Sequence, residues 1–259
     1  MGLKEKLHNI RGKVSGTKWQ TMFGAVHTLF YTPNETTHSG GHIKGADDLK
    51  RLMTNVIIPL IPILIFAMFN VGFQQNIAIN GYQEGMSFLS GNFWNLDNFL
   101  IGATKLVPLL LVSYVVGLGI EIIFATINNH EVEEGYFVSG MLVPLIIPID
   151  TPLWMLAVAV AFGVVIGKEV FGGTGMNILN VALTARAFLY FAYPSQISGD
   201  VWSYLGDEKA VDAFTGATPL ALGAESLATG KNLVTTLGGF GQGWADGIYS
   251  FGNMFMGIM

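Results

Sequence analysis

Glu121 is the residue of this chain whose type and surroundings most clearly suggest chemistry. It follows Gly117 and Gly119 in a long apolar stretch that ends at Ile127. A carboxylate inside such a stretch is costly, and such groups usually face a cavity, a charged partner or an ion path. Glu121 also lies about two helical turns from Ile127, so its side chain could instead reach toward water. Both interpretations stay open here, whereas Lys105, one turn from its own helix end, is expected to extend outward.

A second candidate site is the glycine-rich segment FGGTGMNILN at 171–180. Glycines let a backbone approach a ligand closely, and the start of the helix that follows directs N–H groups toward it. In a helix predicted to begin near residue 178, Asn177, Asn180 and Thr184 share one face. Spacing alone favours a simpler interpretation, a tight turn between two helices that is capped by Asn177.

The third candidate is a hydroxyl in the segment DAFTGATPL at 212–220. Gly216 and Ala217 leave the side chain of Thr218 sterically open. Pro219 biases Thr218 toward an extended backbone. This suits a hydroxyl presented to a modifying enzyme, although the segment also has the composition of an ordinary polar loop.

Composition limits the chemistry. The 259 residues include no cysteine, which excludes disulfides, thiolate metal sites and thiol catalysis from this chain. His38 and His42 are four apart, but Ser-Gly-Gly separates them, so we expect no metal site. With a net charge of −5 and no basic patch interleaved with aromatic residues, nucleic acid is not an expected partner. Electrons could pass through this chain only on an organic cofactor or through another subunit.

The elements that must position these residues are membrane helices. The chain is 51% hydrophobic and 12% charged, whereas roughly 25% of residues are charged in a typical soluble domain. We predict an all-α, polytopic membrane protein with about five transmembrane helices or half-helices. The third and fifth are short and contain or precede proline, which is typical of broken helices. The expected segments are 52–73, 100–127, 136–149, 153–171 and 178–193.

Charge asymmetry predicts the topology. Eight of the 13 Lys and Arg residues lie in 1–51, which we interpret as a basic leader in the cytoplasm by the positive-inside rule. A membrane domain over 52–194 follows, and five crossings place residues 195–259 outside. Thr218 is therefore expected on the external side.

The chain resembles the B subunits of the bacterial sodium-translocating NADH:quinone oxidoreductases over essentially its whole length. Two segments, 168–200 and DAFTGAT at 212–218, are specific to this family and its relatives. The resemblance includes TLFYTP at 28–33, DLKRLM at 48–53, HEVEEGYFV at 130–138 and KEVFGGTGMNILNVALTARAFLYFAYPSQISGD at 168–200. The family continues with a second membrane half of similar organisation, so we expect this chain to be the first, N-terminal half of a two-repeat bundle.

The resemblance implies a set of site residues. Thr218 would bear FMN through a phosphoester that a separate flavin transferase makes from FAD. Glu121 would belong to the sodium path and Gly117 to the quinone region. A second, non-covalent flavin, riboflavin, would lie near Gly172, Gly173, Asn177 and Asn180. Met176 and Val181 depart from the family pattern, which has arginine and proline there.

The implied function is electron relay in the bacterial inner membrane. Covalent FMN and riboflavin would pass electrons to quinone, coupled to sodium export, together with the other subunits of the complex. No catalytic side chain is expected in this chain beyond the flavins. Two alternatives remain: the flavinylated subunit of an ion-pumping ferredoxin:NAD oxidoreductase, and a cofactor-free transporter or channel whose path is lined by Glu121 and the asparagines.

Overall fold

A computed structural model of this chain describes residues 40–41, 49–80, 91–128, 135–173, 175–197, 200–202, 224 and 226–230. This described part is helical and contains no strand, as the sequence predicted. The α-helices are α3 (Leu49–Asn80), α4 (Leu96–Asn128), α5 (Gly135–Ile146), α6 (Leu153–Gly167) and α7 (Val181–Ala192). Short 3-10 helices follow at η1 (Glu169–Phe171), η2 (Pro194–Gln196) and η3 (Asp200–Trp202).

Three helical segments are long and apolar enough to cross a membrane, and two apolar helices are shorter. The long ones are Asn55–Asn76, Leu96–Asn128 and Leu153–Phe171. The short ones, α5 and α7, have 12 residues each and are therefore about 18 Å long. The predicted pattern of long spans and half-helices is thus present. Proline lies inside α3, α4 and α5 without ending them, as neighbouring helices allow in membrane proteins.

The connection between the first two spans is shorter than predicted. We expected a polar loop over 74–99, but α3 continues to Asn80 and α4 begins at Leu96. Contacts at the end of α3 explain the extension. The amide of Asn76 donates to the side chain of Asn98, and the ring of Phe73 packs 5.3 Å from that of Phe93. Polar side chains that suggested a loop thus make contacts across the helix pair.

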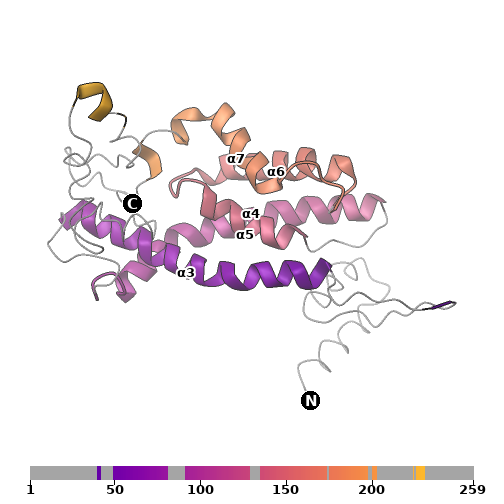
Figure 1. The fold of residues 1–259 in the computed structure, drawn as a ribbon, viewed down its shortest axis with the longest axis horizontal. Coiled ribbons are helices and arrows are strands. Elements are labelled where there is room, and N and C mark those ends of the chain that lie inside the picture. The colour runs from indigo at the N-terminus through magenta and orange to yellow at the C-terminus, as the bar shows by residue number, and fades with distance from the viewer. Residues whose placement is uncertain are drawn as a thin grey trace, which may run out of the picture.

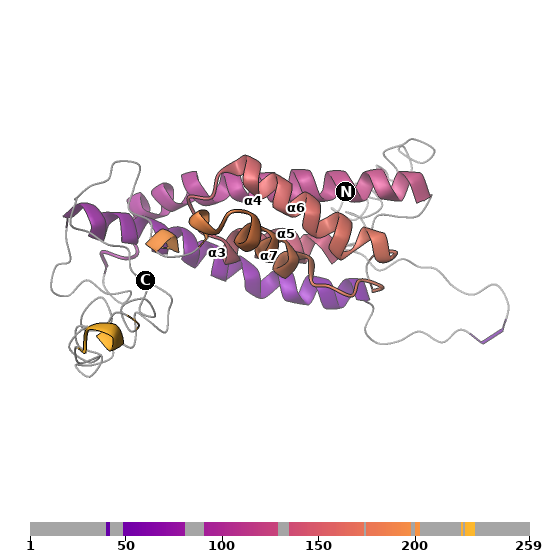
Figure 2. The same cartoon turned by 90° about the horizontal axis from the view of Figure 1, so that it is seen from above.

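Successive helices run in opposite directions along the long axis of the bundle (Figures 1 and 2), and α4 packs against several of them. It contacts α3, α5 and α6, and α7 packs on α6. Gly72 lies against Asn98 and Gly102 against Met68, so α3 and α4 are antiparallel. The carboxyl end of α4 therefore lies beside the start of α3. The pairing of Glu121 with Lys168 places the end of α6 there too.

The core lies between α4, α5, α6 and α7. Leu109, Val143, Leu156, Val160 and Leu189 are almost fully buried in it. The outward faces of the same helices carry large apolar side chains, among them Leu111, Val115, Ile123 and Val158. Helices that are apolar on all sides are expected when lipid surrounds the bundle.

Candidate functional site

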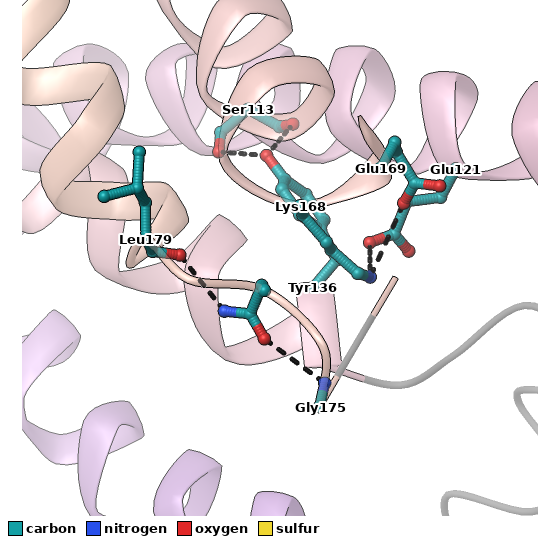
Figure 3. Close-up of polar contacts among 8 residues, drawn as sticks. Ser113, Glu121, Tyr136, Lys168, Glu169, Gly175 and Leu179 are labelled. Atoms are coloured by element: carbon teal, nitrogen blue, oxygen red, sulfur yellow. Dashed lines mark hydrogen bonds and ion pairs between the residues drawn. The ribbon is translucent and has the colours of Figure 1, made fainter. Parts of the chain in front are cut away.

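Three buried charged side chains meet at the end of the bundle where α4 and α6 finish. The ammonium of Lys168 pairs with Glu121 of α4 and lies 3.9 Å from a carboxylate oxygen of Glu169. The side chains of Glu121 and Lys168 are only 3% and 5% exposed. Figure 3 shows the lysine extending from one element toward the carboxylate of the other. Of the two interpretations of Glu121, the structure supports the buried, partnered one.

The chain reverses direction at Lys168, which explains how its side chain reaches α4. Its backbone N–H completes α6 by donating to the carbonyl of Val164, at 3.1 Å. Its carbonyl accepts from the N–H groups of Phe171 and Gly173, at 3.1 and 3.2 Å. Lys168 thus ends one helix and begins the next turn. Glu169 is the first residue of η1, and it is buried as well.

Lys168 was not among the site residues predicted from the sequence. The predicted span 153–171 contains Lys168 and Glu169 near its end, where charged side chains commonly extend toward water. A buried charge requires a partner, because an isolated ion away from water costs several kcal/mol. The presence of opposite charges in two apolar spans, Glu121 in one and Lys168 in another, indicated that each side chain needs a partner, but not that they are each other's partner.

Gly117 lies one turn before Glu121 and accommodates an aromatic ring. A Cβ atom on Gly117 would come within 1.9 Å of the ring of Tyr136 in α5. That tyrosine is fully buried, and its hydroxyl donates to the carbonyl of Ser113, at 2.9 Å. The hydroxyl of Ser113 in turn donates to the carbonyl of Gly140. The quinone assignment of Gly117 stays a prediction, and the contact that the structure shows for this residue is with Tyr136.

The glycine turn, residues 172–180, begins directly after η1. Gly172, Gly173 and Gly175 have φ angles of 108°, 98° and 91°. Side chains rarely permit this left-handed region, so the path of the turn requires these glycines. Asn177 holds the far part of the turn, because its side chain accepts from the N–H of Gly175 and donates to the carbonyl of Leu179.

Two details of the predicted helix after the glycine turn are wrong. The helix begins at Val181 rather than Ile178, and its N-cap is Asn180 rather than Asn177. The reason is local: the carboxamide oxygen of Asn180 accepts from the N–H of Leu183, at 3.1 Å. Asn177 and Asn180 are therefore turn and cap residues and do not lie on a helix face with Thr184.

The residues of the turn are chemically compatible with a flavin ring. Exposed asparagine amides carry both donors and acceptors, as do the carbonyl and N–H groups on one edge of such a ring. Ile178 and Leu179 are exposed beside them and offer surface for its apolar part. Gly117, Glu121 and the glycine turn are brought to the same end of the bundle, joined through Lys168 and Tyr136. Thr218 and the segment 212–220 lie outside the described residues.

Comparison with known proteins gives a consistent result. The model of the NQR2, RnfD, RnfE family matches residues 36–259. The B subunit of the Na(+)-translocating NADH-quinone reductase of Ectopseudomonas mendocina is 44% identical over 233 residues, 84% of this chain and 56% of that protein. The corresponding proteins of Chromohalobacter salexigens and Klebsiella pneumoniae are 45% and 39% identical, over 81% and 95% of this chain. The chain spans 52% and 64% of the length of those two relatives.

Proposed function

Because this chain belongs to the NQR2, RnfD, RnfE family, we propose that it acts as a membrane subunit of a sodium-translocating NADH:quinone reductase in the bacterial inner membrane. Its task there is to relay electrons to quinone while sodium crosses the membrane. The similar proteins, which are named for a Na(+)-translocating NADH-quinone reductase, support this activity. The other subunits, quinone and sodium are then its partners.

One structural observation carries the proposal: the buried Glu121–Lys168–Glu169 group beside the glycine turn. Ionisable residues inside apolar helices are costly, and in membrane proteins they mark ion and proton paths. The group is bonded to the turn, because the carbonyl of Lys168 accepts from the N–H of Gly173. A charge that moves near Glu121 therefore lies close to whatever the turn binds. Such proximity would let ion movement at Glu121 influence electron transfer at the turn.

The proposed cofactors are riboflavin at the glycine turn and FMN on Thr218, and these flavins supply the electron-carrying chemistry when bound. The residues of the chain bind and orient. The left-handed glycines would let the backbone approach the ring, and the exposed Asn177 and Asn180 would offer amide groups to it. Thr218 presents a hydroxyl for the phosphoester, which the flavin transferase forms. The absence of cysteine agrees with electron transfer by flavin.

The covalent flavin gives the most direct test. We would express the full-length protein with a flavin transferase and examine it on a denaturing gel under ultraviolet light. A phosphoester survives denaturation, so the protein band should fluoresce. Thr218→Ala should abolish the fluorescence, and Thr218→Ser should retain part of it because a hydroxyl remains.

Thr215→Ala is the matched control, since Thr215 belongs to the same segment and its replacement should leave the fluorescence intact. Riboflavin released from the native protein is measured separately by chromatography. A colourless protein that still moves ions would favour the cofactor-free transporter. A flavinylated protein that exchanges electrons with ferredoxin and does not reduce quinone would favour the ferredoxin:NAD enzyme.

A further inference from the structure

Lys168 makes contacts in two directions, and we propose that it is a positioning residue that couples the charge of Glu121 to the conformation of the glycine turn. Its side chain bonds to Glu121 of α4, which is 47 residues earlier in the sequence. Its backbone holds the start of the turn. In Figure 3 the lysine lies between the carboxylates on one side and the segment that leads to Gly175 on the other.

The side-chain contact depends on charge. Lys168 and Glu121 are both buried, and removing the partner of a buried ion leaves an uncompensated charge. If a proton or a bound monovalent cation neutralises Glu121, the ammonium keeps Glu169 as its nearest described counter-ion, 3.9 Å away. The electrostatic attraction toward α4 is then reduced relative to the attraction toward η1. The ion pair between Lys168 and α4 is therefore present in one charge state of Glu121, and at most a weaker hydrogen bond remains in the other.

The backbone contact transmits that change. The carbonyl of Lys168 accepts from the N–H groups of Phe171 and Gly173, and Gly173 is buried at a φ of 98°. Glu169, the alternative partner of the ammonium, lies in the same short helix as Phe171. Movement of the lysine away from α4 thus shifts the residues that begin the turn. Because these bonds anchor the first part of the turn, its conformation follows Lys168.

This inference rests on the proposed function in one respect, that the glycine turn holds a flavin and Glu121 lies on the cation path. Under that function, a cation that arrives at Glu121 alters the surroundings of the flavin without touching it. Lys168 then supplies the link between sodium and electron transfer. The structural part, the dependence of the turn on the Glu121–Lys168 pair, can be tested without any flavin.

A distance measurement tests the structural part. The 259 residues contain no cysteine, so spin labels can be placed on Ile127→Cys in α4 and Met176→Cys in the turn, both exposed positions. The labels are introduced into the full-length protein in its complex, with cysteines elsewhere replaced by serine. Double electron–electron resonance should give one narrow distance distribution for the parent and for Lys168→Arg, which keeps the charge. Lys168→Met and Glu121→Gln should each broaden or displace it.

Lys105→Met is the matched control, because it removes a lysine from the other end of α4 and should leave the distribution narrow. If Lys168→Met does not fold, Glu121→Gln/Lys168→Met lacks both charges and serves in its place, with the same displaced distribution expected. A parent-like distribution in folded Lys168→Met, or in the double variant, would overturn the proposal.

A kinetic measurement without spin labels tests whether Lys168 and Glu121 act together during turnover. Lys168→Met and Glu121→Gln should lower kcat by similar factors, up to about 100-fold, as expected when a remote residue misplaces a reacting group. The double variant should be no slower than the slower single variant, because the two residues act as one unit. If the reduction in kcat of the double variant equals the product of the two single reductions, the proposal is contradicted. A parent protein without flavin or reductase activity would instead contradict the proposed function, and the distance measurement would still decide the role of Lys168.

Discussion

Helix α4 makes two contacts of opposite character, one with α3 and one with the end of α6. Toward α3 the contact is made by backbone against backbone, at Gly72 and Gly102. Toward α6 it is made by a buried ion pair, Glu121 with Lys168. The first contact has no charge, and besides the close backbone packing it includes the hydrogen bond from Asn76 to Asn98. The second depends on the ionisation of both partners.

The difference shows how one membrane helix can be fixed and responsive at the same time. Small residues allow close van der Waals packing, which is a main attraction between helices in lipid. A contact of that kind does not change when an ion passes. A buried ion pair is stable only while both charges are present. We therefore expect α3 and α4 to move as one unit, and the end of α6 to be the part that responds to charge.

The largest expected effect is the loss of one partner of the ion pair. Lys168→Met leaves Glu121 in an apolar environment without its main counter-ion, and should lower the free energy of unfolding by about 3–5 kcal/mol. Unfolding of the purified protein in mild detergent, followed by circular dichroism, measures it. Glu121→Gln/Lys168→Met should recover part of the loss, since the charge of Glu121 is removed together with its partner and only Glu169 loses a counter-ion. A double variant less stable than both single variants would show that charge pairing does not explain this contact.

The next largest loss of stability is expected for Gly102→Ala, which tests the contact between α4 and α3. The new methyl group would lie 1.8 Å from the carbonyl oxygen of Met68, and the two backbones would have to separate. We expect a loss of about 3 kcal/mol, visible in the same unfolding experiment. Gly119→Ala is the control: nothing lies within 4 Å of its Cβ position, so its effect should stay within about 0.5 kcal/mol. Equal effects at the two positions would contradict backbone packing.

Gly117→Ala should cost about 2 kcal/mol, because the methyl group would displace the ring of Tyr136 and weaken its bond to Ser113. The same substitution in a Tyr136→Ala background should cost much less, because the ring is absent. The free energies of unfolding of the parent, the two single variants and the double variant give the coupling energy between the two positions. If quinone reduction falls in Gly117→Ala but recovers in the double variant, the effect passes through Tyr136. Loss of quinone reduction in both variants would favour direct contact between Gly117 and quinone.

The smallest effect is expected at the start of α7. Asn180→Ala removes the N-cap bond to Leu183 and should cost about 1 kcal/mol. Asn180→Asp keeps an acceptor oxygen and should retain the stability. Riboflavin content, measured after denaturation, separates capping from cofactor binding. Loss of riboflavin in Asn180→Asp at normal stability would indicate a direct contact with the amide.

Sequence predicted the helical spans well because each apolar run is long relative to its polar neighbours. The same criterion misplaced the end of α3, since Gln74 and Asn76 are polar yet lie within the helix. It also misplaced the start of α7, because several residues between Gly175 and Val181 could act as a cap and only the turn geometry selects Asn180.

The candidate site was predicted in part. Glu121 was predicted to be a site residue from its position deep in an apolar span, and that position can be recognised from one helix alone. Its partner Lys168 was not, because the pairing depends on α4 and α6 lying side by side, a tertiary contact that one sequence does not encode in any local pattern. Gly117 was assigned to the quinone region only by the family resemblance, and its contact with Tyr136 required the packing of α5.

The length of α4 relates the site to the bilayer itself. Its 33 residues extend about 50 Å, whereas the hydrocarbon layer is roughly 30 Å thick. Even at a tilt of about 40°, the upper end of the usual range, the helix still projects about 38 Å along the membrane normal. Hydrophobic mismatch therefore acts on α4, and lipids with longer acyl chains should reduce its tilt. Because α3 is packed on α4 through glycine, both helices would reorient together, which makes membrane thickness a variable to control in any assay of this protein.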